Sequence, residues 1–299
     1  MITDALIERI VGMKNPTCVG LDTSFDYLPD EMRAGVKDFA GAAERIFDFN
    51  KTLIDRLYDV VPSVKVQIAY YEMYGVPGLK AFEETLRYAA EKGLIVIADA
   101  KRNDIGSTAA CYSSAFLGET KVEGNASRAF PADFLTVNAY LGTDGIAPFV
   151  DDCKKRDRGI FVLVKTSNPS SGELQNKLLA DGTLVYEYMG ALVEKWGEGT
   201  EGKYGYSAVG AVVGATHPEE AARLRKLLPH TFFLIPGYGA QGGNAQMLKC
   251  CFGADGLGGV VNNSRGILCA YRKRGGTYYD AARAAALDMQ RDLASVLGL

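Results

Sequence analysis

The segment from Asp99 to Asp104 carries charged residues at a spacing that could support acid–base chemistry. Asp99 and Lys101 are separated by one residue, so on a β-strand their side chains project from the same face. Asp104 follows three residues later, and Lys65 lies in the preceding apolar run. If the two runs form neighbouring strands, two carboxylates and two ammonium groups alternate and fix one another's ionisation. Such a buried network contributes little to stability, whereas a catalytic site could use it.

Each of these residues also has a purely structural interpretation. Asp104 alone is typical of a helix N-cap. Lys65 could be a residue at the edge of a strand, with its aliphatic stem packed and its ammonium in water. Arg265 could be a surface arginine, and a glycine-rich loop is usually a turn. The functional interpretation gains weight because all of these residues lie in or directly after predicted strands, and so on one rim of the predicted fold.

Short apolar runs alternate with segments of helical period along the whole chain. The eight runs span residues 17–22, 63–68, 94–99, 134–138, 160–165, 208–214, 232–236 and 258–262. Eight such units predict an α/β fold, a closed (β/α)8 TIM barrel, with a doubly wound open sheet as the alternative. No linker divides the chain, so we expect one domain over residues 1–299.

In a TIM barrel, chemistry lies where the strands end and the loops to the following helices begin. Distinctive side chains occupy those positions in the sequence: Asp22, Lys65, Asp99, Lys101, Asn138, Ser167, Gln241 in the loop 236–243, and Arg265. Loop amides around 239–242 and the guanidinium of Arg265 could donate hydrogen bonds to a phosphate dianion. The sequence therefore predicts a phosphate site after the seventh and eighth strands.

The composition restricts the classes of partner. The formal net charge is −3 and the pI is about 5.6, which argues against a nucleic-acid or membrane-surface partner. No window approaches a membrane span, and residues 1–9 lack the features of a secretory signal. The six cysteines form no C-x-x-C pair, and there are two histidines. We therefore expect no metal site, no cofactor and no disulfide framework, and a cytoplasmic location.

The segment 99–108, DAKRNDIGST, resembles the D-x-K-x-x-D-I signature of the orotidine 5′-monophosphate decarboxylase family. VGLD at 19–22, PGYGAQGG at 236–243 and Ser264-Arg265 extend the resemblance to nearly the whole chain. The long third and fifth loops are similar to those of the bacterial type 2 subgroup. D-x-K-x-x-D alone also occurs in sugar-phosphate decarboxylases and aldolases of the same superfamily, but its combination with P-G-x-G-A-Q-G-G is specific.

The resemblance implies decarboxylation of orotidine 5′-monophosphate to uridine 5′-monophosphate, in de novo pyrimidine biosynthesis, without metal or cofactor. Lys101 would protonate C6 of the pyrimidine, and Asp99 would lie against the substrate carboxylate. Lys65 and Asp104 would complete the charged array. In this family the second aspartate reaches into the partner subunit's site, so a homodimer with shared active sites is implied.

The resemblance also implies a set of binding residues. Asp22 and Lys65 would contact ribose hydroxyls, Ser167 the edge of the pyrimidine, and Gln241 and Arg265 the phosphate. The other implied substrate-binding residues are Pro236 at the start of its loop, and Ile105 and Thr108, which accompany Asp104 into the partner's site. Asn138 and the long segment 167–204 match the short members of the family poorly and receive no role.

Two other functions remain open at this stage. A metal-dependent sugar-phosphate decarboxylase or aldolase would stabilise an enediolate on a metal held by acidic residues at strand ends, but Ser167 and the A-Q-G-G loop weigh against it. A non-catalytic nucleotide-binding barrel would gain nothing from two extra carboxylates in a pocket for an anion.

Overall fold

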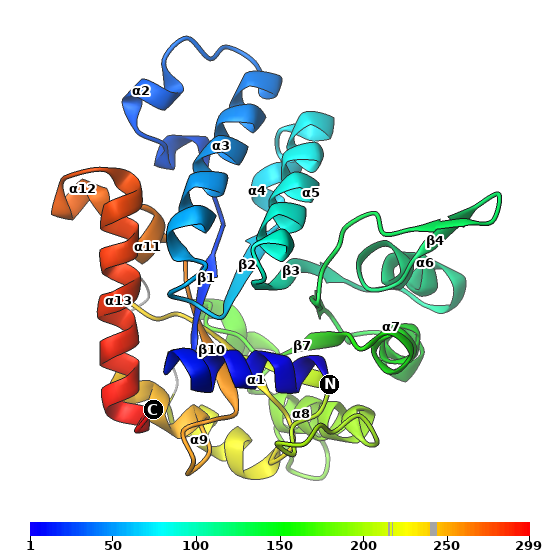
Figure 1. Ribbon diagram of the computed structural model, residues 1–299. Coiled ribbons are helices and arrows are strands. Elements are labelled where there is room, and N and C mark those ends of the chain that lie inside the picture. Colours follow the sequence, from blue (N-terminus) through cyan, green and yellow to red (C-terminus); the bar gives the residue numbers. More distant parts are fainter. Residues whose placement is uncertain (215, 217, 240–243) are drawn as a thin grey trace.

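Eight parallel strands close into a barrel, in the order β1-β10-β9-β8-β7-β6-β3-β2 (Figure 1). The computed structural model describes residues 1–299 except 215, 217 and 240–243. The barrel strands are β1 (Thr17–Gly20), β2 (Ser63–Gln67), β3 (Ile95–Arg102), β6 (Phe134–Val137), β7 (Gly159–Lys165), β8 (Val209–Val213), β9 (Phe233–Pro236) and β10 (Gly259–Asn263). The predicted TIM barrel and its eight strands are confirmed, and the open-sheet alternative is excluded because β1 pairs with both β2 and β10.

Helices surround the barrel and bury their apolar faces against it (Figure 1). The longer ones are α3 (Phe39–Leu57), α5 (Gly75–Glu91), α6 (Gly106–Phe116), α7 (Thr143–Arg156), α8 (Val185–Gly197), α9 (Pro218–Leu227) and α13 (Tyr278–Leu297). In α3, the apolar side chains of Ile46, Phe49, Leu53 and Leu57 recur at helical spacing and are buried. The side chain of Asp38 caps this helix by accepting a hydrogen bond from the backbone N–H of Gly41.

One end of the barrel is closed by helix α1 (Ile2–Met13), which the sequence analysis did not predict. Leu6, Ile7 and Ile10 are buried in a cluster with residues of the barrel interior, among them Phe134 and Phe161. These two rings stack with their centroids 5.0 Å apart. Because this end is filled with apolar side chains, the polar site is confined to the opposite end, where the strands finish.

Short elements fill the loops at the other end of the barrel. They are α2 (Asp30–Arg33), α4 (Ala69–Glu72), α11 (Arg265–Leu268), α12 (Tyr271–Arg274) and the 3-10 turns Phe25–Tyr27 and Pro169–Glu173. After β9, α10 (Ala245–Leu248) and the 3-10 turn Lys249–Cys251 lie in the outer layer beside α9. Strands β4 (Thr120–Val122) and β5 (Asn125–Ser127) form an exposed antiparallel hairpin, which projects from the body of the molecule after α6 (Figure 1). This hairpin accounts for the long third loop, at residues 118–131.

Candidate active site

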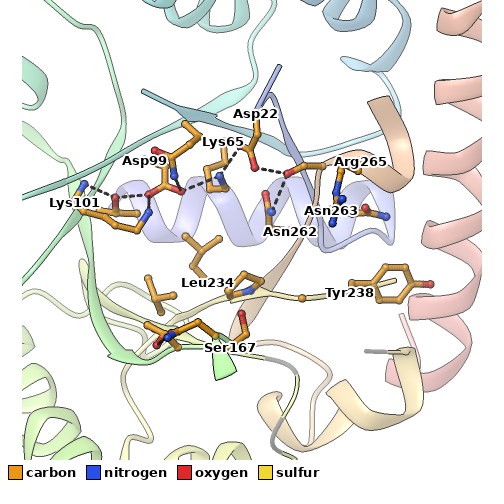
Figure 2. Close-up of a pocket in the computed structure, with 18 of the residues that line it drawn as sticks. Asp22, Lys65, Asp99, Lys101, Ser167, Leu234, Tyr238, Asn262, Asn263 and Arg265 are labelled. Atoms are coloured by element: carbon orange, nitrogen blue, oxygen red, sulfur yellow. Dashed lines mark hydrogen bonds and ion pairs between the residues drawn. The ribbon is translucent and has the colours of Figure 1, made fainter. Parts of the chain in front are cut away.

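A cavity of about 630 Å³ opens at the carboxyl ends of the strands. Seven of the residues predicted for the site line it: Asp22, Lys65, Asp99, Lys101, Ser167, Pro236 and Arg265. Gln241 lies outside the described residues. Lys101 and Arg265 lie at opposite ends of this pocket, and a row of charged side chains extends from Lys101 through Asp99 and Lys65 to Asp22, on the way to Arg265 (Figure 2).

The row consists of alternating acids and bases. The Lys65 ammonium lies 2.9 Å from Oδ1 of Asp22 and 2.9 Å from Oδ2 of Asp99. The Lys101 ammonium lies 2.6 Å from the other oxygen of Asp99, Oδ1. The Lys65 and Asp99 side chains are only 6% and 8% exposed, whereas Lys101 is 44% exposed and faces the cavity. Lys101 is therefore the cation of the row that a ligand could reach most readily.

Lys65 and Asp99 hold each other in their charged forms. Burial alone would lower the pKa of Lys65, but the nearby carboxylates of Asp22 and Asp99 outweigh it and raise that pKa well above its usual range. Burial would likewise raise the pKa of Asp99, but Lys65 and Lys101 outweigh it, and the pKa lies well below its usual range. Both groups are thus ionised at neutral pH.

Asp99 accepts four hydrogen bonds, two of them from neutral side chains. The amide of Gln67 donates to Oδ2 over 2.8 Å, and the hydroxyl of Thr136 donates to Oδ1 over 2.8 Å. Sequence reasoning missed both residues. The available signal was a polar residue inside a predicted strand, since both lie in runs that are otherwise mostly apolar.

Backbone geometry directs Lys101 into the site. Its φ angle is +49°, in the left-handed region that non-glycine residues rarely adopt. Strand β3 is irregular here, because its register against β6 shifts between Ala98 and Arg102. Such bulges re-aim side chains and are frequent next to active sites.

The eighth strand supplies the polar groups next to Arg265. Ser264 donates a hydrogen bond to Oδ2 of Asp22 over 2.7 Å. Gly20 makes this contact possible, since a Cβ there would lie 2.0 Å from the Ser264 hydroxyl. Asn262 and Asn263 also line this end and were missed, because they stand within the predicted eighth strand and its first following residue.

The opposite side of the pocket combines polar residues of the loop after β7 with apolar side chains. Ser167 and Leu234 lie across the pocket from the charged row (Figure 2). Leu163 and Val212 extend this apolar side. Gly214 allows the chain at Ser167 to approach β8, since a Cβ at Gly214 would lie 2.9 Å from the Ser167 backbone nitrogen.

The structure does not bring Asp104 into the charged row of its own chain. The Asp104 carboxylate accepts a hydrogen bond from the backbone N–H of Ile105, and neither residue lines the cavity. Ile105 and Thr108 are exposed. Within one chain, Asp22 is therefore the second carboxylate of the row. The interpretation of Asp104 as a helix cap is wrong as well, because Ile105 holds the N-cap position of α6.

Asn138 has a local structural role. Its side-chain oxygen accepts a hydrogen bond from the backbone N–H of Tyr140, two residues later, and Asn138 does not line the cavity. This contact is typical of an Asx turn, which starts the loop to α7.

The charge pattern favours an organic anion over a metal ion as the ligand. The Lys65 ammonium stands between the two carboxylates that a divalent cation would need. Among the residues that the structure describes, no three His, Cys, Asp or Glu side chains cluster as metal ligands. All six cysteines are free. Across the described part of the chain, no helix combines the length and hydrophobicity needed to traverse a bilayer.

The fold and the site together define a TIM-barrel enzyme with a lysine–aspartate array at one end of its pocket and an arginine at the other. The sequence model of the family "Orotidine 5'-phosphate decarboxylase / HUMPS family" matches residues 17–273, and the chain belongs to this family.

Individual relatives match this chain over most of its length. The chain is 44% identical to orotidine 5'-phosphate decarboxylase of Clostridium acetobutylicum over 300 residues, which covers 99% of this chain and 100% of that one. It is 43% identical to the protein of that name from Caldicellulosiruptor bescii, over 90% of both chains. The solved structure of Leishmania donovani OMP decarboxylase superposes with a TM-score of 0.75 at 29% identity, covering 100% of this chain and 99% of that one.

Proposed function

We infer that the protein is a carboxy-lyase that converts orotidine 5′-monophosphate to uridine 5′-monophosphate and carbon dioxide, a step of pyrimidine biosynthesis. The observation that carries this inference is the Lys101 ammonium, held 2.6 Å from Asp99 in the same cavity as Arg265. Family membership and the full-length relatives of that name support it.

The chemistry explains why such an array is needed. Loss of carbon dioxide from C6 leaves a carbanion in the plane of the pyrimidine ring, where the π system cannot delocalise it. Groups fixed in place before the reaction can stabilise the developing charge without reorganising. We propose that Lys101 is this group, and that its ammonium then donates a proton to C6.

We propose that Asp99 has a second effect on the substrate. Two like charges about 4 Å apart repel by roughly 4 kcal/mol at an effective dielectric near 20, so an Asp99 carboxylate facing the substrate carboxylate disfavours the bound ground state. This repulsion disappears as neutral carbon dioxide forms. Because Lys65 and Lys101 keep Asp99 ionised, the repulsion is present at neutral pH. We rank it below stabilisation of the carbanion.

The remaining site residues are proposed to bind the nucleotide. Asp22 and Lys65 are assigned to the ribose hydroxyls, Ser167 to the edge of the base, and Arg265 to the phosphate. Pro236 at the end of β9 and Gln241 in the following loop complete the proposed binding set. Phosphate binding far from C6 can supply energy that appears in the rate.

We propose that the active unit is a homodimer in which Asp104, Ile105 and Thr108 enter the partner's site. These residues are accessible in the single chain, as this role requires. Large apolar side chains are exposed on the segments that follow β2, β3 and β6: Met73, Val76 in the first turn of α5, Ile105, Tyr140 and Leu141. Exposed apolar groups of this size on neighbouring loops are typical of a surface that another subunit covers.

Three further proposals follow from the same observations. The reaction needs no metal or cofactor, since Lys65 supplies the positive charge between Asp22 and Asp99. The protein acts in the cytoplasm, where six free cysteines stay reduced. Residues 1–299 form one domain, because α1 packs into the end of the same barrel that α13 covers.

The test is to mix purified protein with orotidine 5′-monophosphate and follow its ultraviolet absorbance. Turnover supports the proposal. Turnover only of sugar phosphates, and only with Mg²⁺, would identify the metal-dependent lyase instead. Titration calorimetry with uridine 5′-monophosphate separates the non-catalytic barrel, which would bind the nucleotide without forming product.

A further inference from the structure

We propose that Thr136 is a positioning residue for the decarboxylation, which holds Lys101 and Asp99 in their reactive arrangement. This inference rests on the proposed function. Thr136 lies on β6, lines the cavity and is 1% exposed. Its hydroxyl accepts a hydrogen bond from the backbone N–H of Lys101 over 2.9 Å and donates one to Oδ1 of Asp99 over 2.8 Å.

The pairing of β3 with β6 explains why the Thr136 side chain can reach the backbone of Lys101. Ala98 of β3 is opposite Leu135 of β6, and Arg102 is opposite Val137. Three residues of β3, from Asp99 to Lys101, therefore face the single residue Thr136. The regular ladder of backbone hydrogen bonds is interrupted over this bulge. The Thr136 side chain supplies the acceptor that the ladder would otherwise have provided to the Lys101 N–H.

The direction of the two hydrogen bonds is fixed by chemistry. A backbone N–H can only donate, so the Thr136 oxygen must accept from Lys101. A carboxylate can only accept, so the one proton of the hydroxyl points to Asp99. Thr136 thus links the backbone of Lys101 to Oδ1 of Asp99, the oxygen that the Lys101 ammonium also contacts over 2.6 Å.

Removing the hydroxyl has a specific consequence. The Lys101 N–H loses the Thr136 oxygen as its acceptor, and the left-handed backbone at φ +49° loses a hydrogen bond that holds it. The backbone relaxes, and the ammonium moves away from the position that the reacting carbon requires. Arg265 lies at the other end of the pocket and stays in place, so substrate binding is retained while the chemical step slows.

The experiment compares three variants in the same absorbance assay. Thr136→Val keeps the shape and removes the hydroxyl, whereas Thr136→Ser keeps the hydroxyl. Thr85→Val is the matched control, since Thr85 is also fully buried but lies in α5 and does not line the cavity. We expect Thr136→Val to lower kcat by about 100-fold with little change in KM, and Thr136→Ser and Thr85→Val to remain near the wild type.

A crystal structure of Thr136→Val gives a readout that does not depend on turnover. We expect the Lys101 φ angle to become negative and its ammonium to leave Oδ1 of Asp99. Thr136→Ala replaces the valine variant if the latter does not fold. An unchanged Lys101, an unchanged kcat, or a serine variant as slow as the valine variant would overturn the role of Thr136. A wild-type protein without turnover would instead overturn the proposed function, and the crystal structure would still decide whether Thr136 positions Lys101.

Discussion

The ammonium nitrogen of Lys101 lies 2.6 Å from Oδ1 of Asp99, an ion pair between residues that one position separates. Side chains two apart on a regular strand run parallel and do not turn toward each other. The left-handed backbone of Lys101 removes this parallel arrangement. As a result, the carboxylate is buried while the ammonium keeps one side open to the cavity.

The first prediction concerns this ammonium. Lys101→Ala should fold and bind uridine 5′-monophosphate but show almost no decarboxylation, because it lacks both the cation that stabilises the carbanion and the proton donor. We expect a loss of at least about 1,000-fold in kcat, measured by the absorbance assay. Near-normal turnover of a folded Lys101→Ala protein would remove Lys101 from its proposed role.

The second prediction concerns the pH dependence of stability through Asp99. The pKa of Asp99 is lowered in the folded protein, so the unfolded chain takes up the proton first as the pH falls. The stabilisation by the charged carboxylate is therefore complete above the unfolded pKa of about 4 and is lost below it. Asp99→Asn should lower the free energy of unfolding by about 3 kcal/mol at pH 7 and at pH 5, and by less at pH 3.5.

Urea denaturation of both proteins at the three pH values measures this difference. Lys65 sets the pH dependence of stability on the alkaline side. Its pKa is raised, so its contribution is complete below the usual lysine pKa and is lost only at more alkaline pH. An equal effect of Asp99→Asn at pH 7 and pH 3.5 would contradict the assigned charge state.

The sequence was sufficient for the barrel and for the ring of strand-end residues. Hydrophobic alternation predicts each strand, and a closed barrel brings the ends of all its strands to one rim, so Asp22, Lys65 and Arg265 share a cavity although they lie far apart in the chain. Helix α1 could also be predicted from the sequence. Its apolar residues Ile2, Leu6, Ile7 and Ile10 have the spacing of one helical face.

The sequence was not sufficient for the contacts within the cavity. The D-x-K-x-x-D spacing places Asp104 near Lys101 in the chain, yet Asp104 does not line the cavity. The left-handed backbone of Lys101 could not be predicted either, because glycine, the residue that usually marks this conformation, is absent from that position. Thr136 and Gln67 act through hydrogen bonds to Asp99 across more than 30 positions of sequence. Such contacts depend on strand register, which residue types alone do not specify.

The third prediction is that exhaustive chelation leaves the activity unchanged. The Lys65 ammonium lies 2.9 Å from both Asp22 and Asp99 and already neutralises the carboxylates that could bind a divalent cation. The measurement is kcat/KM after dialysis against EDTA, with and without added Mg²⁺. An activity that disappears and then returns with Mg²⁺ would favour the metal-dependent lyases.

The fourth prediction concerns Lys165, a lysine that is 1% exposed at the end of β7. Its ammonium lies 2.7 Å from Oδ1 of Asn176 and 3.3 Å from Oε2 of Glu220, and so fastens the loop that carries Ser167 to α9. Lys165→Met should lower the free energy of unfolding by about 2 kcal/mol, because it removes a buried ammonium from an ion pair whose other member, Glu220, is 23% exposed. We also expect a higher KM, since Ser167 loses its support.

Thermal unfolding and steady-state kinetics test this role of Lys165. Lys155→Met is the matched control, because Lys155 is 71% exposed and pairs with Asp151 over 3.9 Å at the surface. It should change the stability by less than about 1 kcal/mol and leave KM unaltered. A Lys165→Met protein as stable as this control would show that the loop is held by other contacts.

The last prediction tests the shared active site by mixing two inactive variants. In the proposed dimer, each site takes Lys101 from one subunit and Asp104 from the other. A hybrid of Lys101→Ala with Asp104→Ala then contains one site with both substitutions and one site with neither.

Random reassociation makes about half of the dimers hybrids, so about a quarter of all sites become intact. Activity should rise from near zero to about a quarter of the wild-type value after the variants are unfolded and refolded together. The control is a mixture of variants that were refolded separately. Assayed immediately after mixing, it should remain inactive. If co-refolding restored no activity although sedimentation showed dimers, Asp104 would act within its own chain, and the long contact from Asp104 to the partner's site would have to be abandoned.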